Sequence, residues 1–490
     1  MKKISNCGSI FEHFLVWVLF LNAIFLGTST AQERFRKNPP YPEPLSELNL
    51  PEIESATLSN GLDLSIVRLE GQPVIHLLLV IRTGESSAPE RAPGMPTFTA
   101  NMLNRGTEGY SYSKIVEIIE SIGGSFSSRT SPDYSVFTFG FLEDYLDEAL
   151  EILSRMLLQP TFPKVEVDNV VRIAYYDLLA KNSAPDFVAK RLLSKILFKN
   201  HPYSKMALDE TASRNFDRIG LMDFFDKHYR PNNAEIILIG DITLQTAARK
   251  VSRYLNTWIK KDRETEPLTP PLPNQKIKIC VVDLPGEKDA TVYLGNIFLL
   301  DNPLDYFPLI VLNQVIGGSP HSRLFMNLRE SKGYAYYAFS SLEFYKVCGL
   351  FTITERVRPE VISDSIRESL REIQSVSTSV IPNQEIEQAK SYLIGNFPIE
   401  IENTNYFSTK LAEIRAFNLG ESFWNQYYKN LMLINADNVF EVSKKSFLRT
   451  PVVVVIGELQ ALSQYLRDFD LEIYDSKGEH QYTIKQGVLQ

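Results

Sequence analysis

The sequence predicts an α+β protein of two homologous domains, each a mostly antiparallel β-sheet backed by helices. Three observations predict this fold class. The 490-residue chain is longer than one compact core normally supports. Short apolar runs of strand length alternate with longer segments whose apolar residues have helical spacing. This order of elements occurs twice, on either side of a charged, proline-rich segment at residues 261–275 that has the composition of a linker.

The first domain is expected over residues 53–260. It opens with a hairpin whose turn is Asn60-Gly61, a dipeptide typical of two-residue turns, and its second helix ends at Gly123-Gly124. Strands are expected at 54–71 (the hairpin), 74–84, 135–142 and 234–242, and helices at 95–104, 112–122, 144–160 and 164–182.

The second domain, expected over residues 276–475, repeats this order, and residues 476–490 form a tail. Its helix at 383–397 corresponds in kind and place to the helix at 164–182, and its strand at 451–459 to the strand at 234–242. The other expected strands are 276–286, 290–300, 334–344 and 348–357, and the other expected helices are 307–318, 321–331 and 358–376.

The N-terminus is predicted to be a signal peptide, residues 1–31, followed by a proline-rich lead-in, residues 32–52. Lys2 and Lys3 precede an apolar run that is too short to span a bilayer, and small residues stand where a signal peptidase cuts. We expect export, to the periplasm of a Gram-negative bacterium or to the medium, without a stable membrane anchor; an uncleaved anchor is the alternative. Because the net charge is −8 and there is no basic block, nucleic acid is not an expected partner.

Two cysteines remain after the signal peptide, Cys280 and Cys348. Two cysteines in an exported chain of this size do not make a disulfide framework. Small buried residues are the favoured interpretation, and a single bridge between them stays open.

The stretch GMPTFTANMLNRGT, residues 94–107, carries a resemblance to a known family. The chain resembles the pitrilysin/insulinase family of inverted zinc metallopeptidases, which includes the mitochondrial processing peptidase, over residues 53 to 470. That family has a helix reading G-x-x-H-x-x-E-H-M-L-x-x-G-T. Gly94, Met102-Leu103 and Gly106-Thr107 match this pattern without a gap.

The chemistry of the family's pattern is missing. Two histidines four apart on one helix face can bind one Zn²⁺, and the glutamate beside the second can take a proton from water. Here these positions are Thr97, Ala100 and Asn101, none of which can do this work. Asp177 is the candidate for the family's third-ligand position, but one carboxylate cannot hold a catalytic zinc. The resemblance therefore implies no metal and no other cofactor in this chain.

A second motif is nearly intact. GGSPHSRLFMNLRESKGYAYYAFSS, residues 317–341, resembles the family's G-G-x-x-x-S-R-L-x-x-x-L-R-E-x-x-G-x-A-Y pattern. In two-subunit bacterial members, one chain brings the zinc motif and the other brings an Arg–Tyr pair from this motif. Carried over, the pair is Arg329 and Tyr336. A guanidinium and a phenol can stabilise the oxyanion formed when a peptide carbonyl is attacked, or grip a neighbouring carbonyl.

Alternatives stay open for these residues. Arg329 can be a helix-surface charge and Tyr336 a half-buried sheet residue. A strand slip of one residue would bring Tyr334 or Tyr337 inward instead. Arg323, in the same motif, is expected to brace the structure.

The function implied is that of a zinc-free, non-catalytic subunit of an exported heterodimeric peptidase. A related zinc-bearing chain would be the partner, zinc would be held there, and unfolded peptides would be the substrate. Arg329 and Tyr336 would act in trans and bind substrate. The alternative is an inert peptide-binding or scaffold protein of the same fold. An enzyme active on its own would need metal ligands for which the sequence offers no source.

Overall fold

A computed structural model describes residues 51–489 except 206–215, 262–267, 273, 275, 301, 418, 421, 448–449 and 486–487. The predicted signal peptide, all but the last two residues of the lead-in, and much of the predicted linker lie outside the described residues. No helix in the described part of the chain is long and apolar enough to cross a membrane.

The first half contains a mixed sheet covered by helices. Its strand order is β1 (Ile53–Thr57), β2 (Asp63–Arg68), β8 (Ala234–Gly240), β3 (Val74–Ile81), β7 (Ser135–Leu142) and β6 (Ser125–Thr130). All neighbouring pairs are antiparallel except β2–β8. The helices are α2 (Met95–Met102), α3 (Tyr112–Ser121), α4 (Leu146–Leu158), α5 (Lys164–Lys181), α6 (Pro185–Phe198), α8 (Arg218–His228) and α9 (Leu244–Leu255).

The second half repeats the sheet. The strand order is β11 (Ala335–Phe344), β12 (Gly349–Val357), β10 (Ala290–Phe298), β13 (Val452–Gly457), β9 (Lys278–Asp283), β14 (Leu471–Tyr474), β15 (His480–Lys485) and β16 (Val488–Leu489). The helices are α10 (Tyr306–Ile316), η6 (Phe325–Ser331), α11 (Ile362–Thr378), α12 (Asn383–Glu402), α13 (Thr404–Phe417), α14 (Ser422–Asn425), α15 (Tyr427–Leu433), α16 (Ala436–Phe447) and α17 (Leu459–Leu462).

The two sheets share one plan, so the predicted α+β duplication is confirmed. Read from β6, the first sheet runs β6-β7-β3-β8-β2-β1, and the second runs β11-β12-β10-β13-β9-β14. The parallel pair β2–β8 corresponds to β9–β13. One difference lies at the outer strand, because β1 precedes its sheet in sequence and β14 follows it. The residues expected as a C-terminal tail include β15, which pairs with β14.

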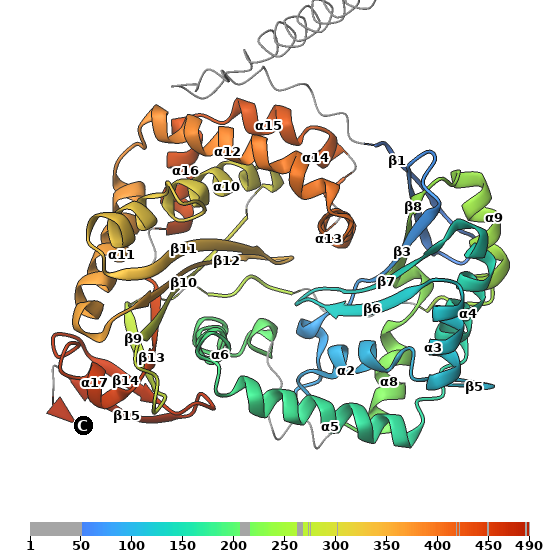
Figure 1. Ribbon diagram of the computed structural model, residues 1–490, viewed down its shortest axis with the longest axis horizontal. Helices are drawn as coiled ribbons and strands as arrows, with labels where there is room; N and C mark the ends of the chain where they lie inside the picture. The colour runs from blue at the N-terminus through green and yellow to red at the C-terminus, as the bar shows by residue number, and fades with distance from the viewer. Residues whose placement is uncertain are drawn as a thin grey trace, which may run out of the picture. The chain divides into compact units, whose positions relative to one another are not determined.

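One helix of each half packs against the sheet of the other half (Figure 1). Helix α6 packs Val188, Ala189 and Leu192 against residues of β9, β10 and β13 in the second half. Helix α13, which follows α12 as α6 follows α5, packs Leu411 and Ala412 against residues of β2, β3, β7 and β8 in the first half. Both faces of β8 and β13 are covered as a result, which explains why every residue of these strands is buried.

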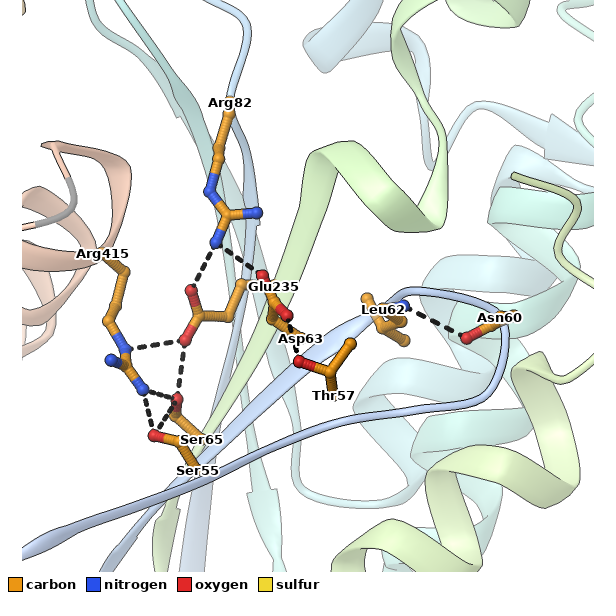
Figure 2. A network of polar contacts seen from close by, with 9 residues as sticks. All are labelled: Ser55, Thr57, Asn60, Leu62, Asp63, Ser65, Arg82, Glu235 and Arg415. Carbon is orange, nitrogen blue, oxygen red and sulfur yellow. Dashed lines mark hydrogen bonds and ion pairs between the residues drawn. The ribbon is translucent and has the colours of Figure 1, made fainter. Parts of the chain in front are cut away.

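An ion-pair network also joins α13 to the first sheet (Figure 2). The Glu235 carboxylate, on β8, lies 2.7 Å from Arg415 Nε of α13 and 2.9 Å from Arg82 Nη2. Its third contact is the Ser65 hydroxyl at 2.6 Å. The Glu235 side chain is only 3% exposed. This carboxylate is therefore neutralised partly by its own half and partly by the other.

Cys280 and Cys348 lie in the core. Both Cys280 and Cys348 are buried, both are free thiols, and both belong to the apolar cluster under α6. The favoured interpretation is confirmed, and the structure contains no bridge between them.

Candidate functional site

Helix α2 presents two of the three altered positions to a cavity. It begins after Gly94, whose φ of 86° lies in the left-handed region that glycine tolerates. Because Thr97 and Asn101 are four residues apart, they share one face, and both line a cavity of about 720 Å³ that we call the α2 cavity. Ala100, three residues after Thr97, does not line this cavity; it is 2% exposed and packs in the core of the first half.

Hydrogen bonds occupy the groups that a metal would need. The Thr97 hydroxyl donates to Glu85, and the Thr97 backbone N–H donates to the same carboxylate oxygen at 3.1 Å. The Asn101 side-chain oxygen accepts from Ser128 at 3.1 Å. Burial raises the pKa of Glu85, although the Thr97 hydrogen bonds oppose that shift. An acid–threonine pair thus stands where the family has its first histidine.

Asp177, the candidate for the third ligand, forms an ion pair within its own helix. Asp177, on α5, lines the α2 cavity and forms an ion pair with Lys181 at 2.6 Å, one helical turn away. Within the described residues, no three His, Cys, Asp or Glu side chains are grouped so that they could hold a metal ion. A catalytic zinc takes three protein ligands, so the residues of this cavity do not fit one.

The second motif forms a π-helix, a tight turn and an edge strand. The helix expected at 321–331 is a π-helix over Phe325–Ser331, a geometry that is rare and often found at functional sites. Arg329 lies on it with its side chain 48% exposed, and its guanidinium carbon is 4.8 Å from the centre of the Phe325 ring. Gly333 (φ 62°) then makes the turn into β11.

A β-bulge decides which tyrosine is exposed. In β11, Ala335 pairs with Val357 and Tyr337 with Arg356, so Tyr336 is the extra residue. Tyr336 is 63% exposed. Tyr337 stays in the ladder, half-buried, and burial raises its pKa with a smaller effect from Asp186. The structure therefore exposes Arg329 and Tyr336 on the two sides of the Gly333 turn.

Arg323 braces this motif, as expected. Its guanidinium donates to both oxygens of Glu385 on α12, at 2.7 and 3.1 Å, and to Ser375 of α11 at 2.9 Å. Such a two-point contact fixes orientation as well as distance. The start of the π-helix is thereby tied to two neighbouring helices.

Sequence reasoning missed the edge strand β6. Within the described part of the chain, β6 pairs only with β7 and stands at the end of its sheet. Phe126, Ser128 and Thr130 line the α2 cavity. An edge strand has backbone N–H and C=O groups that can pair with another extended segment. The alternation of polar residues with Phe126 in SFSSRT was the available signal for this strand.

The fold and these two motifs define a protein of the M16 peptidase class whose described residues do not group into a metal site. The insulinase (peptidase family M16) model matches residues 67–211, and the peptidase M16 inactive domain model matches residues 215–393. The chain belongs to this family.

Curated relatives include proteins described as proteases and as non-proteases. The chain is 27% identical to the uncharacterized zinc protease YmxG of Bacillus subtilis, over 72% of this chain and 85% of that protein. It is 26% identical to the non-peptidase homolog YmxG of Helicobacter pylori, over 73% of this chain and 83% of that protein. A solved peptidase M16 inactive domain from Pseudomonas fluorescens has the same fold, with a TM-score of 0.77 at 22% identity over 83% of this chain and 97% of that one.

Proposed function

We propose that this chain is the zinc-free subunit of an exported two-chain M16 peptidase. A related chain with an intact His-x-x-Glu-His helix would be its partner and would hold the metal. One contrast carries the proposal. In the α2 cavity, Thr97 and Asn101 are tied up in hydrogen bonds where ligands would stand, whereas Arg329 and Tyr336 of the second motif are exposed.

Peptide binding is the first part of this role. The open edge of β6 offers main-chain donors and acceptors beside the α2 cavity. An extended peptide can pair with such an edge through its backbone, whatever its side chains are. An unfolded peptide is therefore a better substrate than a folded protein, whose strands are already paired.

Arg329 and Tyr336 supply the second part. When a peptide carbonyl in the partner's site is attacked, negative charge grows on its oxygen. A guanidinium that stays charged at every physiological pH and a phenol O–H can each donate to that oxygen. Removing one donor of this kind typically costs about 3–4 kcal/mol in the barrier, a rate loss of roughly a hundredfold or more.

The test mixes the purified chain with its zinc-bearing partner and follows cleavage of an unstructured, internally quenched peptide. We expect Arg329→Ala to lower the rate of the mixture by roughly a hundredfold while the two chains still associate. Arg371→Ala is the matched control, because Arg371 is an exposed helix arginine (69%) outside the motif. An unchanged rate with Arg329→Ala refutes the role in trans.

A second candidate is an inert peptide-binding or scaffold protein of the same fold. The non-peptidase description of the Helicobacter pylori relative favours it. This candidate predicts peptide binding without cleavage in any mixture with a zinc-bearing relative. In either case, the proposal of export depends on the N-terminal segment. Sequencing the N-terminus of the mature protein tests whether the chain is cleaved after residue 31.

A further inference from the structure

A second cavity, of about 630 Å³, lies at the end of β6, where the β6–β7 turn meets α10, β11, α12 and α13. We call it the tyrosine cavity. Its lining includes the aromatic residues Tyr134, Tyr306, Tyr345, Tyr406, Tyr427 and Phe417. Aromatic faces carry partial negative charge and attract cations.

The charged residues of this cavity add to that preference. Four carboxylates (Asp133, Glu343, Glu400 and Glu413) and two cations (Arg129 and Lys410) line it, a difference of two negative charges. Lys410 pairs with Glu413 at 2.9 Å.

The Glu400 carboxylate is held by neutral groups. It accepts from the Asn396 amide at 2.6 Å and from the Tyr406 hydroxyl. The field of the carboxylates reaches the tyrosines as well: burial, and next the charge of Glu413, raises the pKa of Tyr134 to about 12. The phenols of this cavity therefore stay neutral, and the excess of negative charge remains on the carboxylates.

One buried donor at the cavity has no acceptor. Gln314 on α10 borders the tyrosine cavity and is only 5% exposed. Among the described residues, nothing accepts a hydrogen bond from its side-chain nitrogen. A buried amide without its hydrogen bond costs free energy. A carbonyl oxygen brought in by a ligand would satisfy it.

The strand β6 links the two cavities. Ser127, Ser128 and Thr130 line the α2 cavity, while Arg129, and Ser131 directly after the strand, line the tyrosine cavity. Side chains alternate between the two faces of a sheet. A peptide paired with the edge of β6 near Arg129 would therefore place side chains toward both cavities.

We propose that the tyrosine cavity binds the cationic side chain, Lys or Arg, of an extended peptide paired with β6. The aromatic faces pack on the apolar stem of that side chain, and Glu400 and Glu413 neutralise its head. Gln314 donates to a peptide carbonyl. This inference rests on the proposed function in one respect only, that the chain binds peptides.

The experiment measures binding of a labelled, unstructured peptide to the purified full chain by fluorescence anisotropy. One peptide carries a single Arg among small neutral residues, and its twin carries citrulline, which has the same shape without the charge. We expect the Arg peptide to bind about tenfold more tightly than the citrulline peptide. The double variant Glu400→Gln with Glu413→Gln should reduce this ratio to less than about twofold. Glu441→Gln, an exposed acid of α16, is the matched control and should keep the ratio of the unmodified protein.

The outcomes separate the two proposals. Equal, measurable affinity of the two peptides for the unmodified protein overturns the cation site and leaves peptide binding standing. Failure of both peptides to bind overturns peptide binding itself. Should the double variant not fold, the comparison of arginine with citrulline on the unmodified protein still decides. A ratio that survives in a folded double variant places the cation elsewhere and also overturns the site.

Discussion

The ion pair between the two halves gives the sharpest test of how they are held together. We consider Arg415→Met, which removes the guanidinium contributed by α13 and keeps most of the side chain's length. Glu235 is then left, 3% exposed, with Arg82 and Ser65 as its remaining partners (Figure 2). Breaking a buried pair typically costs about 3–5 kcal/mol. Because Arg82 remains at 2.9 Å and still pairs with Glu235, we expect a cost at or below the lower end of that range, about 2–3 kcal/mol.

Urea unfolding followed by tryptophan fluorescence, to which the buried Trp258 contributes, measures this cost. A double-mutant cycle with Glu235→Gln isolates the Arg415–Glu235 term, which we expect to be about 2 kcal/mol. The control is the pair Lys164–Asp168, whose side chains are 82% and 60% exposed, and which should couple by less than about 0.5 kcal/mol. A coupling of Arg415 with Glu235 no larger than that of the control would show that this ion pair does not stabilise the contact between the two halves.

The local surroundings of individual side chains lead to three further predictions. Burial raises the pKa of Glu355 to about 7, against hydrogen bonds from two serines, so between about pH 4.5 and 7 the folded state holds a proton that the unfolded state has released. The stability that this proton contributes is full below about pH 4.5 and is lost as the pH rises through 7. Glu355→Gln should flatten this fall of the unfolding free energy with pH, measured by urea titrations across the same range. Tyr336→Phe should lower the cleavage rate of the two-chain mixture by roughly a hundredfold while Tyr337→Phe leaves it unchanged, because only Tyr336 is exposed at the bulge. A larger loss of cleavage rate with Tyr337→Phe than with Tyr336→Phe would contradict the assignment of Tyr336. Cys280 and Cys348 should resist thiol reagents in the folded protein and react once it is unfolded, since burial raises both thiol pKa values, that of Cys280 to about 12; fast labelling of either native thiol counts against this packing.

Much of the fold could be predicted from the sequence because it depends on local pattern. The apolar runs that became β3, β8 and β13 are buried strands, and the repeated order of elements is the order of two matching sheets. The exchange of α6 and α13 could not be predicted. Helical spacing shows which residues of a segment are apolar, but not which of two sheets they will cover.

The site was predictable only where a motif carries it. The positions of Thr97 and Asn101 followed from the matched spacing, and the structure places both in one cavity. Glu85 did not follow, because it reaches Thr97 from a separate segment twelve residues earlier. The π-helix around Arg329 has no periodic signature in so short a segment. The tyrosine cavity was out of reach for the same kind of reason, since its lining comes from distant segments of both halves.

Under the proposed function, this polypeptide does not hold the metal of the reaction in which it takes part. Elemental analysis of the mature chain, purified without its partner and equilibrated with zinc before gel filtration, tests it most directly, alongside a peptide-hydrolysis assay on the same sample. We expect zinc far below one equivalent and no hydrolysis, with both appearing when the partner is added. One equivalent of zinc together with hydrolysis by the chain alone would show instead that this chain holds its own catalytic metal.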